Sequence, residues 1–88
     1  MIRLKHTKKF IKNFRKRIAN NAKLQSQFQE RSKLFLQDPQ NPLLKNHKLS
    51  GARKYLNSFS VTGDIRVLYY EKEEVIYFVD IGTHNHVY

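Results

Sequence analysis

The sequence contains no cysteine and no tryptophan, and it has only three glycines and two prolines. Without cysteine the chain has no disulfide, no thiolate zinc site and no cysteine nucleophile, which is the pattern of a protein kept in a reducing cytosol. No apolar run approaches the ~20 residues that cross a bilayer, and residues 1–10 lack the apolar core of a signal peptide. We therefore expect a cytoplasmic protein that does not span a membrane.

Acidic residues are also scarce, and those present are unevenly distributed. The 88 residues have a formal net charge of +10. All but two of the lysines and arginines lie in residues 1–54, where Glu30 and Asp38 are the only acids, whereas residues 55–88 are weakly acidic. A basic surface of this kind attracts polyanions, so nucleic acid is the favoured partner. The alternatives are a solvated helix face and an acidic protein partner.

The hydrophobic content is high enough for a folded core. Hydrophobic residues make up 40% of the chain and aromatic residues 12%, which argues against a disordered chain. Domains usually contain about 100–150 residues, so there is room for one small domain, residues 1–88, with a single core.

Apolar periodicity divides the first half of the chain into a strand and two helices. Residues 2–6 alternate apolar and basic side chains, as a strand with one buried face does. Thr7 can cap a basic amphipathic helix whose apolar positions follow helical spacing. A second helix is predicted over residues 22–36, because asparagines precede it and Asp38-Pro39 ends it. The apolar positions of the first helix are Phe10, Ile11, Phe14 and Ile18.

The second half of the chain has the composition of strands. Residues 38–49 contain both prolines and little periodicity, so we expect a loop there. Residues 55–61, 65–71 and 74–81 are rich in aromatic and β-branched side chains and are separated by short turns. The predicted fold is α+β, with an N-terminal strand, an α-helical hairpin packed on the sheet, and a three-stranded antiparallel meander (β-α-α-β-β-β).

Candidate catalytic residues gather near the C-terminus. Histidine is the side chain best suited to move protons near neutral pH, although a single surface histidine is usually inert. Asp64 and Arg66 border a predicted strand, and alternation would place them on one face, where a salt bridge is the simplest role. Residues 81–88 leave the last strand through Gly82 and concentrate titratable groups. The histidines are His6, His47, His84 and His86.

Three short blocks, taken in this order, resemble the RelE/ParE toxin superfamily, in particular its RelE and YafQ-like messenger RNA interferases. The blocks are residues 46–51 (NHKLSG), residues 63–70 (GDIRVLYY), and residues 81–84 (IGTH) running on to Tyr88. No single block is specific, but the resemblance covers essentially the whole chain.

The resemblance implies the toxin of a type II toxin–antitoxin system, silenced by a cognate antitoxin protein. Such a toxin is an endoribonuclease that cuts messenger RNA on the ribosome. The 2′-hydroxyl of the RNA attacks the adjacent phosphorus, and the reaction needs an acid, a base and positive charge but no metal and no small-molecule cofactor.

The resemblance also assigns roles to individual residues. It makes His84 the general acid toward the leaving 5′-oxygen. Either Asp64 or His47 is then the base toward the 2′-hydroxyl, the other holding its partner in place. Arg66 steadies the scissile phosphate, and Tyr88 stacks on a base or orients the histidine. RNA phosphates are expected to bind Lys45, Lys48, Arg53 and Lys54.

Two positions depart from the YafQ pattern, which has a histidine where Ser60 stands and a tryptophan where Ile65 stands. Both departures favour the main alternative, a ParE-like toxin that shares the fold but inhibits DNA gyrase by binding. The presence of the whole acid–base set favours the nuclease. A basic RNA-binding module without toxicity is a further alternative.

Overall fold

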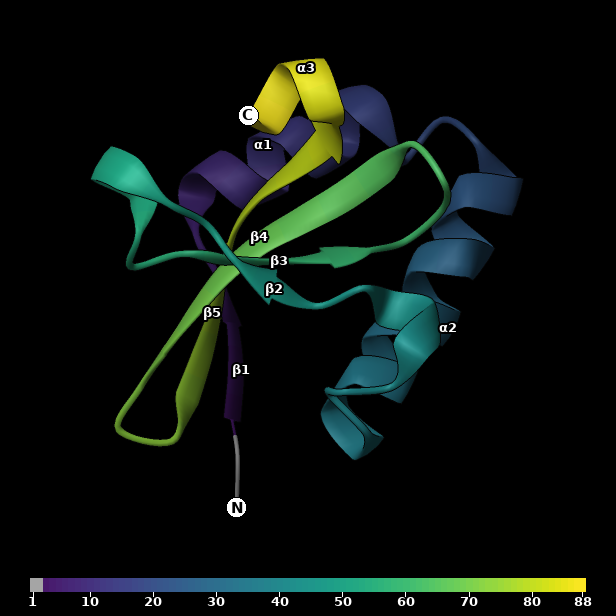
Figure 1. The fold of residues 1–88 in the computed structure, drawn as a ribbon. Helices are drawn as coiled ribbons and strands as arrows, with labels where there is room; N and C mark the ends of the chain where they lie inside the picture. Colours follow the sequence, from purple (N-terminus) through teal and green to yellow (C-terminus); the bar gives the residue numbers. More distant parts are fainter. Residues whose placement is uncertain (1–2) are drawn as a thin grey trace.

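A five-stranded sheet forms the centre of the protein in the computed structural model, which describes residues 3–88 (Figure 1). The strands lie in the order β1-β5-β4-β3-β2; β1 is parallel to β5 and every other pair is antiparallel. The strands are β1 (Arg3–His6), β2 (His47–Lys48), β3 (Asn57–Ser60), β4 (Ile65–Lys72) and β5 (Val75–Thr83). The predicted α+β class is confirmed.

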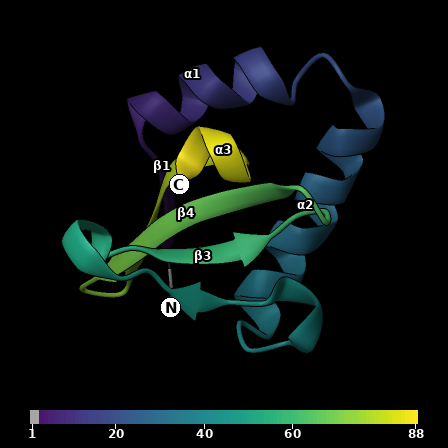
Figure 2. The same ribbon diagram turned by 45° about the horizontal axis from the view of Figure 1, so that its top comes forward.

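Two helices follow β1, as predicted from the apolar spacing. Helix α1 (Lys8–Arg17) begins at Thr7, whose hydroxyl accepts a hydrogen bond from the backbone N–H of Phe10 at 3.2 Å. Helix α2 (Ala22–Gln37) begins at Asn21, whose side chain caps the backbone N–H of Leu24 at 3.1 Å. Figure 2 shows α1 crossing above the sheet and α2 running along its side.

The face of the sheet under α1 and α2 is closed by an aromatic core. Phe35 of α2 stacks on Phe59 of β3 with ring centroids 4.6 Å apart, and its edge meets Tyr69 of β4 at 4.7 Å. Phe10 of α1 contacts Phe78 of β5 at 5.5 Å. Ile11, which the helical spacing placed on the apolar face, is instead 38% exposed.

A second, smaller cluster lies on the opposite face of the sheet. It consists of Leu56, Leu68 and Val87, with Leu49, Tyr70 and Val79 packed against it. On β4, Leu68 points to this cluster while its neighbours Val67 and Tyr69 point into the aromatic core, as strand alternation requires. Val87 belongs to α3 (His84–Val87), a single turn at the C-terminus that the sequence did not predict.

The segment 38–49, predicted as a loop, contains two short elements. Asn41 caps the 3-10 turn η1 (Pro42–Leu44) by accepting a hydrogen bond from the Leu43 N–H at 3.0 Å. The two-residue strand β2 then pairs with β3, so that His47 lies opposite Ser58. Two residues are too few to give a periodic pattern, and a further turn, η2 (Gly51–Arg53), leads into β3.

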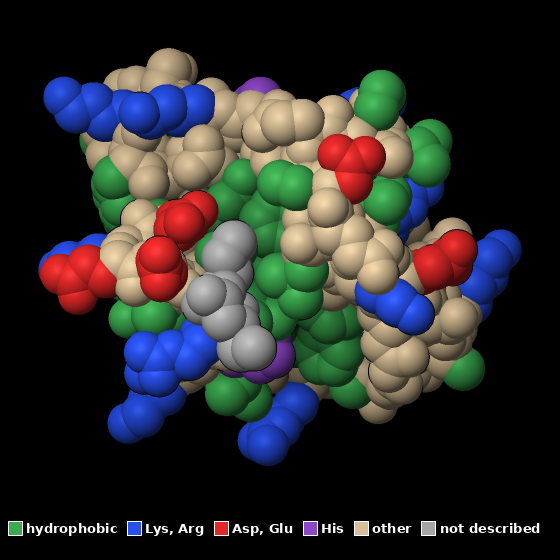
Figure 3. All heavy atoms as spheres, turned by 90° about the horizontal axis from the view of Figure 1, so that it is seen from below, with side chains coloured by type: hydrophobic (Ala, Val, Ile, Leu, Met, Phe, Trp, Pro, Cys, Tyr) green, Lys and Arg blue, Asp and Glu red, His purple; other side chains and the backbone are tan. Residues whose placement is uncertain are grey.

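The hairpin between β4 and β5 turns at Glu73 and Glu74, which both have positive φ, 53° and 66°. Figure 3 views the molecule from this end and shows several acidic side chains close to one another on one side of the view, with others on the opposite side. Farther along β5, Leu68 pairs with Asp80 while Tyr69 pairs with Phe78, so the bulge leaves Val79 without a register partner on β4. No helix within residues 3–88 is long and apolar enough to cross a bilayer.

Candidate active site

The aromatic ring of Tyr88 lies at the centre of the candidate site. Its hydroxyl donates a hydrogen bond to the Ser58 Oγ at 2.5 Å, and Ser58 is fully buried on β3. The His84 ring meets the Tyr88 ring edge-on with centroids 4.4 Å apart. The His47 ring, on β2, lies 6.4 Å from the same ring. Residues 47, 58, 84 and 88 are thus brought together by β2, β3 and the C-terminal turn.

The C-terminal turn is held in place by a capping box. The Thr83 hydroxyl accepts a hydrogen bond from the His86 N–H at 3.4 Å, and the Thr83 N–H donates to the His86 Nδ1 at 3.1 Å. Val87 is 1% exposed, and its carbonyl oxygen accepts a hydrogen bond from Arg53. His86 therefore has a structural role, and the tail is docked.

Arg66 approaches the same ring from β4. Its guanidinium carbon lies 6.0 Å from the centre of the Tyr88 ring, which is a cation–π distance. Among the described residues, its Nη1 is buried and has no hydrogen-bond partner. Because a buried guanidinium N–H without a partner is costly, an anion such as a phosphate would satisfy it.

Asp64 is exposed in the turn before β4, and its backbone N–H donates to the Thr62 hydroxyl at 3.1 Å. Since β4 begins at Ile65, strand alternation does not apply to Asp64. Within residues 3–88, its carboxylate makes no hydrogen bond or ion pair to the other candidates. The structure thus groups His47, Arg66, His84 and Tyr88 and leaves Asp64 at the edge of that group.

The predicted RNA-binding residues are all exposed and flank the site. Lys45 follows η1 with a positive φ of 47°, and Lys48 lies on β2. Arg53 and Lys54 lie in and after η2. Arg53 has a second role that the sequence did not indicate, because it holds the carbonyl of Val87.

His47 makes a contact that determines which of its ring nitrogens carries the proton when the ring is neutral. Its Nδ1 lies 3.0 Å from the carbonyl oxygen of Lys45. A carbonyl oxygen only accepts, so a neutral His47 ring that keeps this bond carries its proton on Nδ1. Its Nε2 is then unprotonated and able to accept a proton.

The remaining histidine, His6, belongs to the other face of the sheet. Its ring stacks on Phe10 with centroids 5.0 Å apart and approaches Phe78 at 5.6 Å. One side of the ring remains exposed, and the partial desolvation by these contacts lowers the pKa of His6 below its usual 6.5. Because its contacts are with Phe10 and Phe78 on the helix-covered face, His6 does not belong to the candidate site.

A buried polar group that the sequence analysis missed connects α1 to the site. Asp80 is 4% exposed and accepts hydrogen bonds from the Asn13 Nδ2 at 2.7 Å and from the Ile81 N–H at 2.8 Å. Arg17 lies 3.5 Å from the same carboxylate and donates to the Ile81 carbonyl at 2.8 Å. The signal in the sequence is a single aspartate within an otherwise apolar strand.

Gly82 follows directly and is closely packed. A Cβ at this position would lie 2.6 Å from the Arg17 Nη1 and 2.8 Å from the His86 Cβ. Only glycine therefore allows α1, β5 and α3 to meet where the tail begins.

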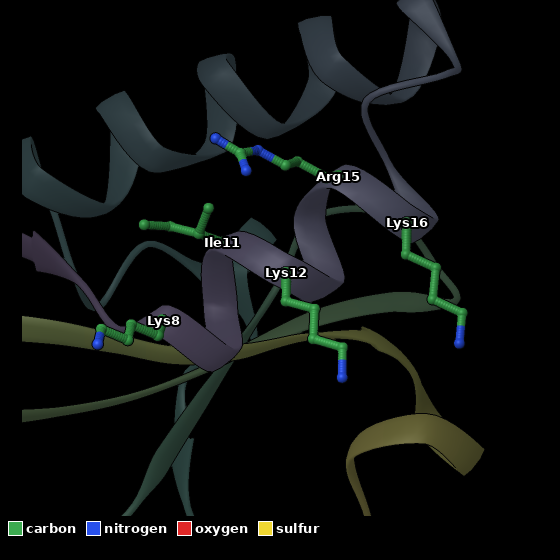
Figure 4. A pocket seen from close by; sticks show the side chains of 5 residues that line it. All are labelled: Lys8, Ile11, Lys12, Arg15 and Lys16. Atoms are coloured by element: carbon green, nitrogen blue, oxygen red, sulfur yellow. The ribbon is translucent and has the colours of Figure 1, made fainter.

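A second surface lies on α1. A hollow of about 770 Å³ is lined by Lys8, Ile11, Lys12, Arg15 and Lys16. Figure 4 shows Ile11 and Arg15 directed toward α2, while Lys12 and Lys16 point to the other side of α1. We call this surface the basic groove.

No group of three or more His, Asp or Glu side chains suited to a metal ion occurs in residues 3–88.

The chain is similar to proteins of one kind along its whole length. A family model described as bacterial toxin of type II toxin–antitoxin system, YafQ, matches residues 2–88. Three similar structures share the fold. The toxin in the Escherichia coli DinJ-YafQ complex has 17% identity and a TM-score of 0.77, over all of this chain and 99% of that one.

A metal-bound toxin from Helicobacter pylori has 24% identity and a TM-score of 0.78, with both chains fully covered. The YoeB/ParE toxin from Agrobacterium tumefaciens has 15% identity and a TM-score of 0.78, over 94% of this chain and 99% of that one. Among curated proteins, none matches the sequence significantly.

Proposed function

Because the chain belongs to the YafQ family of bacterial toxins of type II toxin–antitoxin systems, we propose that it is an endoribonuclease that cleaves messenger RNA on the ribosome. The observation that carries this proposal is the set of side chains that lie around the Tyr88 ring. In the part of the chain that the structure describes, an arginine with a buried N–H that has no hydrogen-bond partner and two histidines lie around one exposed aromatic side chain. These are the groups that a phosphodiester cleavage without a metal ion requires.

Each group has a defined task in the reaction. His47 Nε2 takes the proton from the 2′-hydroxyl, whose oxygen forms a bond to the adjacent phosphorus. The Arg66 guanidinium binds the phosphate oxygens as negative charge develops on them. The bond from phosphorus to the 5′-oxygen then breaks, and His84 gives that oxygen a proton. The products are a 2′,3′-cyclic phosphate and a 5′-hydroxyl.

We assign the base to His47 rather than Asp64 for a geometric reason. The Lys45 carbonyl leaves the Nε2 of a neutral His47 unprotonated, and the ring lies near Tyr88. Asp64 is exposed in the turn before Arg66 and has a positioning or electrostatic role.

The proposed partners follow from the charge. Exposed lysines around the site bind messenger and ribosomal RNA phosphates, which makes binding sensitive to salt. A cognate antitoxin with an acidic amphipathic segment covers the basic groove, where Ile11 offers an apolar contact between cations. A toxin–antitoxin complex in which the antitoxin leaves α1 uncovered would contradict this part of the proposal.

Primer extension on cellular messenger RNA after brief expression tests the proposal. The intact protein should produce cuts within translated codons, and His84→Ala should reduce them by about 10²–10⁴-fold, the usual contribution of a general acid. The matched control is His6→Gln on the opposite face, which should leave the cuts in place. Growth arrest without cuts would rule out the nuclease.

A gyrase inhibitor of the ParE type is the second candidate. Ser60, which stands where the YafQ pattern has a histidine, is buried and donates its hydroxyl to the Thr62 carbonyl at 2.5 Å. That position therefore supplies no acid or base. A triple substitution of His47, Asp64 and His84 distinguishes the two functions, because RNA cleavage should be lost while gyrase inhibition should survive.

A further inference from the structure

The helical turn that carries His84 is too short to hold its own position. Helix α3 contains four residues, and an isolated turn is unstable because its few hydrogen bonds do not offset the cost of ordering it. Contacts from the rest of the fold must therefore place it. Arg53 binds the Val87 carbonyl at the C-terminal end of α3, and Val87 is buried there. The N-terminal end, where His84 lies, must be held separately.

Arg17, the last residue of α1, contacts this N-terminal end. Its Nη1 donates a hydrogen bond to the Ile81 carbonyl at 2.8 Å, shortly before His84 in the chain. The same nitrogen packs against Gly82, where an added Cβ would lie 2.6 Å from it and 3.0 Å from the Nδ1 of His86. The Arg17 guanidinium therefore fixes the segment from which the His84 turn begins.

We propose that Arg17 is a positioning residue for the reaction, holding His84 where it gives its proton to the leaving 5′-oxygen. The inference rests on the proposed ribonuclease function and adds to it a residue of α1 that acts through the general acid. Productive geometry tolerates a displacement of only about 0.5 Å, and misplacement by about 1 Å lowers a rate by about 10²-fold. A contact at the start of a four-residue turn is thus enough to control the rate.

Asp80 holds the guanidinium of Arg17 in place. Asp80 is 4% exposed, and its Oδ1 lies 3.5 Å from the Arg17 Nη1. The Asn13 Nδ2 and the Ile81 N–H donate to the same oxygen at 2.7 Å and 2.8 Å. A buried carboxylate with several donors keeps one orientation, so the guanidinium beside it does the same.

The planar shape of the guanidinium suits this double contact. Arginine presents five N–H groups in a fixed geometry, so one side chain serves both the Asp80 carboxylate and the Ile81 carbonyl. The Arg17 side chain is only 20% exposed, so water competes little for these contacts. A lysine would keep the charge but has one ammonium on a flexible chain, and it would hold the segment less firmly.

A change of leaving group tests whether Arg17 acts through the general acid. Single-turnover cleavage is measured at saturating protein on ribosomes whose messenger RNA has either the natural 5′-oxygen or a 5′-sulfur at a site that the intact protein cuts. A thiolate leaves without a proton, because a thiol is far more acidic than an alcohol. Arg17→Met should slow cleavage of the oxygen substrate by about 10²-fold and change that of the sulfur substrate by less than about twofold. Equal losses on the two substrates would overturn the proposal.

Variants of the two histidines give the reference behaviour. His84→Ala removes the acid and should reproduce the pattern of Arg17→Met, whereas His47→Ala removes the base and should slow both substrates. The double variant Arg17→Met/His84→Ala should be no slower than His84→Ala alone, because Arg17 then has no acid to position. A further loss in the double variant would show that Arg17 acts independently of His84 and would also overturn the proposal.

Two more variants control for charge and for folding. Arg3→Met removes an exposed arginine from β1 and should leave both rates unaltered. Arg17→Lys keeps a cation beside Asp80 and should recover part of the rate on the oxygen substrate. If circular dichroism shows that Arg17→Met does not fold, Arg17→Lys decides. Its smaller loss should again be confined to the oxygen substrate, and a loss on both substrates would contradict the role of Arg17.

The inference and the proposed function fail in different ways. Cleavage by the intact protein, with equal losses from Arg17→Met on the two substrates, would remove the role of Arg17 and keep the nuclease. If the intact protein cleaves neither substrate, the nuclease is refuted and with it any role of Arg17 in the reaction. A loss confined to the oxygen substrate would support both.

Discussion

The two faces of the sheet are built from different material. Under α1 and α2 lies an aromatic core in which Phe35, Phe59 and Phe78 are nearly or fully buried. On the other face, the hydrophobic cluster has only three buried residues and is covered by a single helical turn, and the side chains around Tyr88 remain accessible. The same strands thus have one face for stability and one face for chemistry, because alternate residues of a strand point in opposite directions.

The comparison predicts that the two faces respond differently to substitution, and the largest effect on stability should come from the core. Phe35→Ala removes a ring that contacts Phe59 and Tyr69 and should lower the free energy of unfolding by about 3–5 kcal/mol. Urea unfolding followed by circular dichroism measures it. Leu36→Ala is the matched control, since Leu36 is the next residue of α2 and is 43% exposed. A similar loss in both variants would show that the effect does not come from burial of Phe35 in the aromatic core.

Asn13 and Arg17 of α1 surround the buried carboxylate of Asp80 on β5. Removing one of these contacts should lower the free energy of unfolding by less than the loss of Phe35. Asn13→Ala removes the 2.7 Å hydrogen bond to the buried carboxylate, and bonds to charged groups contribute about 1.5–3 kcal/mol. Because Arg17, Asp80 and Gly82 meet where the tail begins, this variant should also loosen α3. Unfolding measurements and hydrogen exchange at residues 83–88 test both effects.

The control for Asn13→Ala is Asn20→Ala, a change of the same kind at an exposed residue. The control should leave both the unfolding free energy and the exchange of residues 83–88 unaltered. Faster exchange of the tail in the control, or an unaltered tail in Asn13→Ala, would separate Asp80 from the positioning of α3.

The sequence predicted the elements with strong periodic patterns and missed those that depend on distant contacts. Helix α2 was predicted over 22–36 and extends over Ala22–Gln37, because its cap and its terminating proline are local signals. Strand β2 and helix α3 were missed because each is stabilised by residues far along the chain. Ser58 pairs with His47, and Arg53 binds the carbonyl of Val87.

For the candidate site, the sequence indicated some of the residues and not others. The types of the site residues were visible in the sequence, and the structure brings His47, Arg66, His84 and Tyr88 together. The roles of Ser58, Asp80 and Arg53 were not visible, because a buried hydrogen bond between distant residues leaves no local pattern.

On the face that carries the site, a single hydroxyl should have a modest effect. Tyr88→Phe leaves the buried Ser58 Oγ without its partner and should lower the free energy of unfolding by about 1 kcal/mol. Ser58→Ala alone should cost a similar amount, and the double variant should cost less than the sum of the two. Additive losses in this cycle would show that the two hydroxyls do not interact.

The smallest expected effect concerns pH and lies on the helix-covered face. The pKa of His6 is lowered by partial desolvation against Phe10 and Phe78, whereas in the unfolded chain it has its usual value near 6.5. As pH falls through 6.5 the unfolded state takes up the proton first, so stability decreases until the folded pKa is passed. Well above pH 6.5, His6 is neutral in both the folded and the unfolded state, so it no longer affects the stability of the protein. The Tm of the intact protein should therefore fall more between pH 7.5 and pH 5.5 than the Tm of His6→Gln, and equal falls in the two proteins would show that His6 titrates normally in the fold.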